Sequence, residues 1–293
     1  YFKKKVFFQI KIFMNSKYKV LKYRSNNLIE LNDSISIEEP LQIMIKFEQE
    51  KKWVENILSI TMRTPGDDED LVRGFLFNEQ IIEKIEYIDE IKSVGDIVGQ
   101  YSLKNKILAT INNSSNIDIN KIKRNFLTNS SCGVCGKTSL DSLDVIKKDT
   151  IDISLPKISY ETIMSSPTKL RKKQSEFSKT GGIHASGLFS DNGKLLAIKE
   201  DVGRHNALDK LIGYVMKKKL LNPSNQFISC SGRLNFELVQ KALMSNIGVL
   251  IGVGAPTSLA VDLANKFDMT LVGFVKEDSF NIYSNKDRII LKK

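Results

Sequence analysis

The sequence predicts an α/β protein with a layered C-terminal domain and a smaller N-terminal domain of strands and one helix. Apolar stretches of strand length alternate with amphipathic helical patterns from residue 183 onward, which is typical of a sheet covered by helices. A polar stretch rich in Asn, Ser and Lys over residues 112–149 separates this region from the first hundred residues. We therefore expect domains at residues 14–125 and 151–293, joined by a flexible loop at residues 126–150.

The N-terminal domain is expected to hold short strands around one helix, within residues 20–111. Thr64 and Pro65 predict the start of that helix, with the threonine as N-cap and the proline at the first helical position. The acidic run at residues 67–70 suits the positive end of a helix dipole, and a metal-binding cluster is the alternative. An apolar stripe then follows at Leu71, Val72, Phe75 and Leu76.

The C-terminal domain is expected to begin with a β-hairpin around the turn at residues 191–193, with strands at 183–189 and 195–198. Helices and strands then alternate, which implies crossover connections and a mainly parallel sheet with helices on both faces. The expected elements are a helix that Asn206 caps, a strand at 227–230, a helix at 236–244, a strand at 249–253, a helix at 257–267 and a strand at 270–274.

Composition limits the classes of protein to which the chain can belong. Hydrophobic residues make up 41% and charged residues 27% of the 293 residues, far from the composition of disordered chains. The sequence contains no run of about 18 apolar residues, so it predicts no membrane-spanning helix. The net charge of +10 suits nucleic acid, an anionic cofactor or a lysine-rich surface solvated by water. Residues 1–13 lack the pattern of a signal peptide, and we expect translation to begin at Met14.

Cys132 and Cys135 form a C-x-x-C pair and are the first candidates for chemistry. The chain has only three cysteines, too few for a disulfide framework, so we expect a reducing cytoplasm. Such a pair can carry dithiol redox chemistry, half of a zinc site, a persulfide, or no chemistry at all. A structural zinc site is not expected, because Cys230, His184 and His205 form no zinc-type pair.

A second group of candidates lies where the predicted strands begin and end. His184 opens a strand, and Glu200 and Asp201 end one. Arg204 and His205 directly precede a helix. Because ligands of α/β sheets bind beyond the strand ends, we expect this group to line a pocket. For the histidines, the alternatives are a hydrogen-bonded core residue and a helix cap.

Two glycine-containing loops, residues 230–233 and 252–258, each connect a predicted strand to a predicted helix. Their backbone N–H groups and helix dipoles are expected to face the same edge of the sheet, where they can bind an anion. A tight connection without a ligand is the alternative for either loop alone. Together with Arg204, the two loops predict a site for a phosphate-bearing, nucleotide-like ligand.

Seven motifs occur in order between about Ile43 and Ile282. They are RTPGDD at 63–68, GFLF at 74–77, SCGVCG at 131–136, GGIHA at 181–185, EDVGRHNA at 200–207, SGR at 231–233 with Phe236 and Glu237, and GAPTSLA at 254–260. Together they closely resemble the formate dehydrogenase accessory sulfurtransferase (FdhD) family. The resemblance is far more specific than a C-x-x-C pair alone.

The resemblance implies a sulfur carrier, that is, a sulfurtransferase acting through a cysteine persulfide. Such a carrier takes sulfur from a cysteine desulfurase and passes it to the molybdenum (or tungsten) bis-molybdopterin guanine dinucleotide cofactor, before the formate dehydrogenase apoenzyme receives that cofactor. Cys132 matches the persulfide-bearing cysteine of the family, and Cys135 its partner thiol. A homodimer is also implied.

The fold that the resemblance implies is a three-layer, cytidine-deaminase-like C-terminal domain with a smaller α+β N-terminal domain. Deaminase chemistry is not expected, because the zinc signature H-x-E followed downstream by P-C-x-x-C is absent from the sequence.

The family's contact with the guanine dinucleotide matches a segment near the last predicted strands. The cofactor-binding candidates are Phe274, Val275, Lys276, Glu277, Asp278 and Ser279, together with His184, Arg204 and His205. Phe274 can stack on a base, and Lys276 can meet a phosphate. Glu277 and Asp278 depart from the family pattern, and a plain turn is the alternative. The basic stretch at 169–173 can guide phosphates or dock an acidic partner, and a solvated face is the alternative.

We therefore expect a cytoplasmic sulfurtransferase for molybdenum cofactor maturation, with Cys132 as the nucleophile and no structural metal. A non-catalytic chaperone that only binds and delivers the dinucleotide is the first alternative. A nucleic-acid-binding protein is the second, but the sequence holds no recognition-helix pattern or aromatic-basic RNA motif. Neither nucleic acid nor a membrane is expected as a partner.

Overall fold

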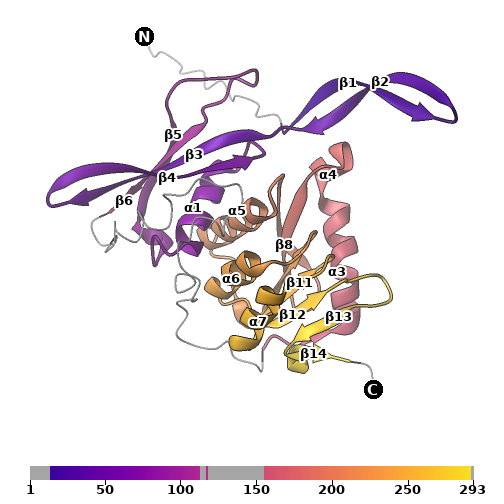
Figure 1. The fold of residues 1–293 in the computed structure, drawn as a ribbon. Helices are drawn as coiled ribbons and strands as arrows, with labels where there is room; N and C mark the ends of the chain where they lie inside the picture. The colour runs from indigo at the N-terminus through magenta and orange to yellow at the C-terminus, as the bar shows by residue number, and fades with distance from the viewer. Residues whose placement is uncertain (1–13, 113–116, 118–154, 292–293) are drawn as a thin grey trace, which may run out of the picture.

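Two bodies that pack against each other make up the fold, seen in a computed structural model of the chain (Figure 1). The structure describes residues 14–112, 117 and 155–291. The loop expected at residues 126–150, with Cys132 and Cys135, lies outside these residues. In the part of the chain that the structure describes, no helix is long and apolar enough to span a membrane.

The N-terminal body is a four-stranded sheet with one helix on its inner face. Its elements are β3 (Glu39–Gln49), β4 (Lys52–Arg63), α1 (Asp68–Asn78), the 3-10 turn η1 (Ile85–Tyr87), β5 (Ile88–Val94) and β6 (Lys106–Ile111). The strand order is β4-β3-β6-β5. Buried apolar side chains alternate along β3, because successive residues of a strand point to opposite faces. These side chains share one core with the apolar stripe of α1.

A β-hairpin precedes this sheet and projects from the body (Figure 1). Its strands β1 (Asn15–Arg24) and β2 (Asn27–Ser36) pair only with each other. Strands β1 to β4 have 10 to 12 residues each, longer than the short strands expected from the sequence.

Helix α1 begins three residues later than expected. Asp67 is its N-cap residue, in a left-handed conformation with φ of 56°, and the first helical residue is Asp68. The expected cap at Thr64 is therefore wrong. The Thr64 backbone N–H donates to Asp201 Oδ2 (3.1 Å), and its hydroxyl accepts from the Val202 N–H (3.1 Å). Contact with the C-terminal body thus uses the hydroxyl that would have capped the helix.

The C-terminal body is built on a six-stranded sheet with the order β13-β12-β11-β10-β8-β9. Its strands are β8 (His184–Ser190), β9 (Leu195–Asp201), β10 (Gln226–Cys230), β11 (Val249–Gly252), β12 (Thr270–Gly273) and β13 (Asn281–Ser284). Strands β10, β11 and β12 are parallel, whereas β8, β9 and β13 each pair antiparallel. The expectation of a mainly parallel sheet is thus wrong, because short loops without a crossover helix join β8 to β9 and β12 to β13. A small sheet pairs β7 (Ile158–Ser159) with β14 (Ile289–Ile290), and 3-10 turns lie at η3 (Pro223–Asn225) and η4 (Lys286–Arg288).

Helices cover both faces of this sheet, so the C-terminal body has three layers. Helices α5 (Arg204–Lys217), α6 (Phe236–Met244) and α7 (Ser258–Lys266) share one core with one face of the sheet. Helix α3 (Tyr160–Lys173) packs on the other face, and the short helix α4 (Ser175–Thr180) follows it. The hairpin around residues 191–193, the strand at 227–230 and the helix at 236–244 are confirmed.

Helices α1 and α5 join the two bodies, and they cross at two glycines. A Cβ atom at Gly74 would lie 2.0 Å from the carbonyl oxygen of Asp209. A Cβ atom at Gly213 would likewise lie 2.0 Å from the carbonyl oxygen of Asp70. Only glycine permits so close an approach of two backbones.

A buried ion pair lies beside this crossing. Lys210 Nζ is 2.7 Å from Asp201 Oδ2, and neither side chain is exposed. Lys210 also donates to a backbone carbonyl of the N-terminal body, that of Thr64 (2.8 Å). Asn206 lies inside α5, where its amide donates to Met62 O (2.8 Å) and Asp201 Oδ1 (3.2 Å). The expected cap at Asn206 is therefore wrong, because its side chain joins the two bodies.

Candidate functional site

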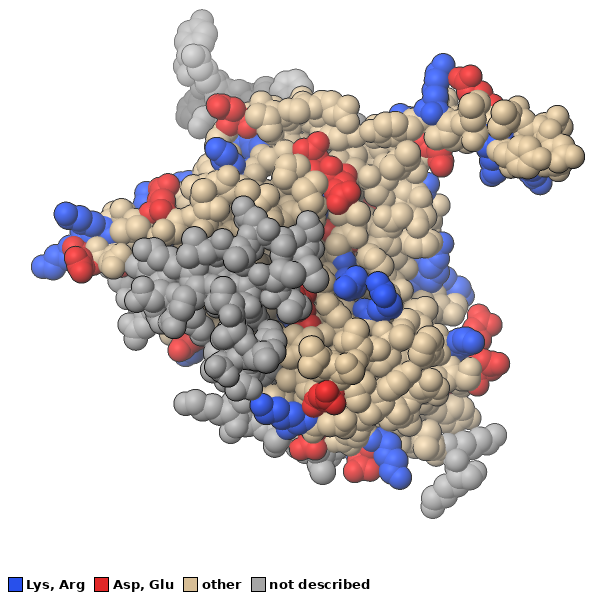
Figure 2. Space-filling model, viewed as in Figure 1, with Lys and Arg blue, Asp and Glu red and all other residues tan. Residues whose placement is uncertain are grey.

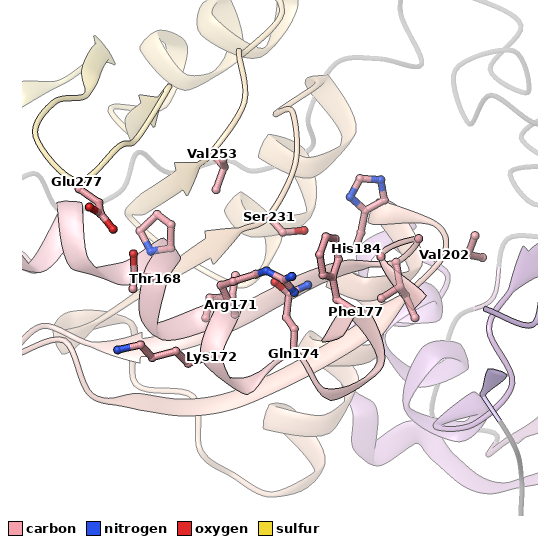
Figure 3. A pocket seen from close by; sticks show the side chains of 15 residues that line it. Thr168, Arg171, Lys172, Gln174, Phe177, His184, Val202, Ser231, Val253 and Glu277 are labelled. Carbon is pink, nitrogen blue, oxygen red and sulfur yellow. The ribbon is translucent and has the colours of Figure 1, made fainter. Parts of the chain in front are cut away.

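A cavity of about 840 Å³ lies along one edge of the C-terminal sheet (Figure 3). Its volume is typical of small-molecule sites, which measure about 300–1,000 Å³. Five neighbouring strands each have a lining residue at or beyond the strand end. These residues are Glu277 after β12, Val253 after β11, Ser231 after β10, His184 at the start of β8 and Val202 after β9. Because neighbouring strands lie about 4.8 Å apart, this edge is about 19 Å long.

The opposite wall comes from the end of α3 and from α4. Arg171 and Lys172 lie in the last turn of α3 and line the cavity. The guanidinium of Arg171 lies over the Phe177 ring, 3.5 Å from its centroid, which fixes the position of this cation. The stretch at 169–173 is therefore not wholly a solvated face, because two of its basic residues line the cavity.

Gln174 is the most informative residue of this wall. It is only 2% exposed, and it lines the cavity between α3 and α4. Its amide Nε2 is buried and has no hydrogen-bond partner among the described residues. Burying a hydrogen-bond donor without a partner costs about 1–3 kcal/mol of folding free energy, so each such group calls for an explanation, for example a bound ligand. The cavity therefore presents a buried donor beside two cations, a combination suited to an anionic ligand.

His184 lies at the other end of the cavity. A Cβ atom at position 232 would be 3.1 Å from His184 Nδ1, so the glycine there makes room for the imidazole. Burial lowers the pKa of His184, and the charges of Arg204 and His205 lower it further. The His184 imidazole is therefore neutral at neutral pH, and it can both donate and accept hydrogen bonds. The expectation that this histidine lines a pocket is confirmed.

Arg204 and His205 are close to this end but are not among the cavity-lining residues. His205 Nε2 is 2.9 Å from Glu237 Oε2 and within hydrogen-bond distance of Asn235. Asn235 is also the N-cap of α6, where its side chain accepts from the Leu238 N–H. The local packing of helices α5 and α6 thus holds His205 away from the cavity lining.

Glu200 and Asp201 were expected to line a pocket, and this is wrong. The carboxylate of Glu200 accepts the backbone N–H groups of Glu176 (3.1 Å) and Phe177 (3.0 Å), so it caps the start of α4. The carboxylate of Asp201 belongs to the junction with Lys210. Burial raises the pKa of Asp201, and the Lys210 ammonium opposes that shift. Both carboxylates therefore serve the fold.

The two glycine-containing loops are only partly as expected. Ser231 and Val253 line the cavity. However, the N–H groups of Leu234, Gly254 and Thr257 donate to backbone carbonyls of the facing loop, which removes these three donors from an anion site.

The segment 274–279 forms a loop between β12 and β13. Phe274 is 44% exposed and has a left-handed backbone, with φ of 52°. Val275 is buried in the core, and the Lys276 N–H donates to Ser279 O (2.8 Å). Of the six candidates here, only Glu277 lines the cavity. Figure 3 shows it beside Thr168, at the end opposite His184.

Cys230 is the one cysteine that the described residues contain, and it is buried. Burial raises the pKa of its thiol to about 11. The reactive thiolate is therefore scarce at neutral pH, and this sulfur is a poor nucleophile. Within the described ranges, no group of three or more His, Cys, Asp or Glu residues is arranged to hold a metal ion.

The chain is similar to known proteins over most of its length. Residues 36–290 match the model of the FdhD/NarQ family. The chain belongs to the FdhD/NarQ family. This FdhD/NarQ protein is 39% identical to the sulfur carrier protein FdhD of Sulfolobus acidocaldarius, over 94% of this chain and 98% of that protein. It is also 39% identical to the protein of the same name from Streptomyces avermitilis, over 94% and 95% of the two chains.

A solved structure similar to this FdhD/NarQ protein is that of a candidate formate dehydrogenase accessory protein from Desulfotalea psychrophila. The TM-score is 0.69 at 23% sequence identity, over 94% of this chain and 100% of that one. This similarity supports the fold described above. The resemblance seen in the sequence motifs is thus confirmed at the level of the family.

Gln174 and Phe177 line the cavity although they carry no motif in the sequence that predicts it. Arg171 lies in the basic stretch at 169–173, for which the sequence left open a phosphate-guiding role, an acidic partner and a solvated face. The only available signal was the run of basic residues at the end of a helix. Their role depends on the packing of α3 against the sheet, which brings them opposite strands that follow later in the chain.

Proposed function

We propose that the chain is a sulfur carrier protein that supports formate dehydrogenase. It accepts sulfur from a cysteine desulfurase as a persulfide on Cys132. It then transfers this sulfur to a molybdenum (or tungsten) bis-molybdopterin guanine dinucleotide, which is its cargo. The observation that carries the proposal is the 39% identity, over 94% of the chain, to a relative named sulfur carrier protein. We place the reaction in the cytoplasm, where thiols stay reduced.

The sulfur transfer needs two thiols. The Cys132 thiolate attacks the outer sulfur of the desulfurase persulfide, that S–S bond breaks, and the desulfurase cysteine leaves as a thiolate. When the cargo is bound, the Cys135 thiolate attacks Cys132 Sγ, which forms a disulfide and releases the outer sulfur as hydrosulfide for the cargo. This disulfide is reduced by a cellular dithiol before the next cycle.

The burial of Cys230 supports the assignment of the sulfur chemistry to Cys132 and Cys135. Its thiol is buried, and its pKa is raised to about 11, so it is unsuited to nucleophilic attack. Because the chain has three cysteines, the sulfur chemistry falls to the C-x-x-C pair.

The cavity fits the nucleotide part of such a cargo. The oxygens of a diphosphate are hydrogen-bond acceptors, and the wall offers the Arg171 and Lys172 cations with the buried Gln174 donor. At one end, Glu277 can accept hydrogen bonds from the N–H groups of a guanine. We therefore orient the guanine toward Glu277 and the sulfur-accepting end toward His184.

Intact-protein mass spectrometry tests the carrier step. After incubation with a cysteine desulfurase and cysteine, we expect a gain of one sulfur that a reductant removes and that peptide mapping places on Cys132. The variant Cys132→Ala should show no gain. Cys230→Ser is the matched control, because it removes a thiol of the same chain and should leave the gain unchanged. A sulfur gain that persists in Cys132→Ala would contradict the proposal.

A non-catalytic chaperone is the second candidate, and the cavity is the observation that favours it. Activation of the formate dehydrogenase apoenzyme separates the two functions. A carrier with Cys132→Ala should bind the dinucleotide as the natural chain does and fail to activate the client. If the variant still activates the client, binding and delivery alone are sufficient.

A further inference from the structure

Three basic residues lie in the last turn of α3, and among the described residues only one of them is held by an aromatic ring. The three are Arg171, Lys172 and Lys173, and the ring lies against Arg171. Figure 2 shows Lys and Arg side chains along the part of the surface where α3 and α4 lie in Figure 1. A lysine is a flexible point charge, whereas a planar guanidinium binds a phosphate through two donors at once. The orientation of Arg171 therefore matters more than that of its neighbours.

The Phe177 ring orients Arg171, and the position of that ring depends on α4. The guanidinium carbon lies 3.5 Å from the ring centroid, and Figure 3 shows the two side chains beside each other in the cavity wall. Helix α4 has only six residues, and a helix of this length is not stable by itself. Contacts from outside the helix must therefore hold it against the sheet.

Glu200 provides such a contact from the end of β9. Its Oε1 accepts the backbone N–H of Phe177 (3.0 Å), while Oε2 accepts the N–H of Glu176 (3.1 Å) and the hydroxyl of Ser175 (3.3 Å). All three groups belong to the first turn of α4. Glu200 is itself fixed in the sheet, where it pairs with Ala185 of β8. The carboxylate thus ties the start of α4 to the sheet.

No local residue replaces this contact. A helix is usually capped by the side chain of its own N-cap residue. The N-cap residue of α4 is Gln174, and its side chain makes no cap hydrogen bond. Glu200 takes over that role from a distant strand, and it is buried while doing so. Burying a carboxylate is costly, so three donors on one short helix are a strong constraint on where that helix lies.

We propose that Glu200 is a positioning residue of the cavity. It holds α4 so that the Phe177 ring orients the Arg171 guanidinium toward the diphosphate of the ligand. The role rests on the proposed function, because that function supplies the diphosphate. Glu200 does not line the cavity, so its effect passes through two contacts in series. The first is the hydrogen bond to the Phe177 N–H, and the second is the packing of the Phe177 ring on Arg171.

Binding of guanosine diphosphate by calorimetry tests the role. Glu200→Gln keeps the size of the side chain but replaces one acceptor oxygen with an NH₂ donor. We expect the affinity to fall about fivefold, within the range of coupling measured between residues in contact. In a chain that already carries Arg171→Ala, the same change should alter the affinity by less than about twofold, because the group that Glu200 positions is gone. In a chain with Lys172→Ala, the fivefold loss should persist.

An unchanged affinity in Glu200→Gln, or an equal loss with and without Arg171, would overturn the proposal. Phe177→Leu tests the second contact and serves where Glu200→Gln fails to fold, because it leaves the backbone N–H for Glu200. It should weaken binding only while Arg171 is present. Glu79→Gln is the matched control for a loss of stability alone. It removes a carboxylate that pairs with Lys241 (3.0 Å) and does not line the cavity, so the midpoint of unfolding should fall at unchanged affinity.

NMR of the Arg171 side chain separates this role from the proposed function, because it needs no ligand. Protons over the face of an aromatic ring resonate upfield, so the Arg171 Nε–H signal should move downfield in both Glu200→Gln and Phe177→Leu. If the natural chain does not bind guanosine diphosphate, the nucleotide site of the proposed function is wrong. The NMR signal alone then decides the role of Glu200, and a signal that does not move in Glu200→Gln would overturn it.

Discussion

Charged side chains are paired at the junction between the two bodies, whereas cations along the cavity at the sheet edge have no carboxylate partner among the described residues. At the junction, Lys210 and Asp201 are fully buried and neutralise each other at 2.7 Å. A second buried lysine, Lys241, lies 3.0 Å from Asp209. Along the cavity, Arg171 and Lys172 have no carboxylate partner among the described residues, and the buried amide of Gln174 has an unused donor.

This difference shows which polar groups hold the fold and which remain for a ligand. A buried charge without a partner is costly, so the junction can keep its charges only as complete pairs. The cavity is open to solvent and can keep unpaired cations at little cost. Substitutions in one region, with the other region or a neighbouring position as the control, test this distinction.

The largest effect is expected from Lys210→Met. Removing the lysine leaves the Asp201 carboxylate buried without its partner, which should lower the free energy of unfolding by about 3–5 kcal/mol. The same change at the cavity, Lys172→Met, should alter it by less than about 0.5 kcal/mol. Urea unfolding followed by circular dichroism measures both. Equal losses in the two variants would abolish the distinction between the regions.

The next effect is expected from Gly213→Ala, at the crossing of α1 and α5. The added methyl group would lie 2.0 Å from the Asp70 carbonyl oxygen, so the helices must separate. We expect a loss of about 1–3 kcal/mol, typical of overpacking. Gly182→Ala at the cavity rim is the control, because the nearest atoms are 3.9 Å away. If Gly213→Ala and Gly182→Ala both unfold at the same urea concentration as the natural chain, the close approach of the two helices does not affect stability.

Arg171→Ala tests the cavity. Calorimetric binding of guanosine diphosphate should weaken about tenfold, which corresponds to about 1.4 kcal/mol. The midpoint of unfolding should fall only slightly, because this guanidinium has no carboxylate partner among the described residues and the variant loses only its contact with the Phe177 ring. Lys173→Ala is the control, since it removes a neighbouring cation of α3 that does not line the cavity. Equal weakening in both variants would indicate general attraction to a basic surface and not a defined site.

The smallest effect concerns protonation of His184. Burial and the nearby Arg204 and His205 lower its pKa, so in NMR titration it should protonate below the usual 6.5. The unfolded chain then binds a proton that the folded chain does not bind, and stability should fall as the pH drops from 6.5 through the folded pKa. His184→Gln should remove this part of the pH dependence. The chain has only two histidines, so the signals can be assigned by one substitution. A His184 signal that titrates above 6.5 would contradict the lowered pKa.

The sequence by itself determined the order and type of most elements of the C-terminal body. Hydrophobic periodicity is a local property, and it located the helix at 236–244 and the hairpin around residues 191–193. The strand ends in the sequence predicted a pocket that His184 lines, whereas Glu277 was a candidate only through the family resemblance. The motifs were specific enough to identify the family.

Only the tertiary structure decided which partner each polar side chain would take. Thr64 and Asn206 have the residue types of helix caps, yet both bind groups of the opposite body, 137 and 144 residues away in sequence. Glu200 likewise serves α4 rather than the cavity. Local sequence fixes what a side chain can donate or accept, but the packing of distant elements fixes what it meets. The cavity wall that contains Arg171 and Gln174 therefore depends on the packing of α3 against the sheet, which the local sequence does not predict.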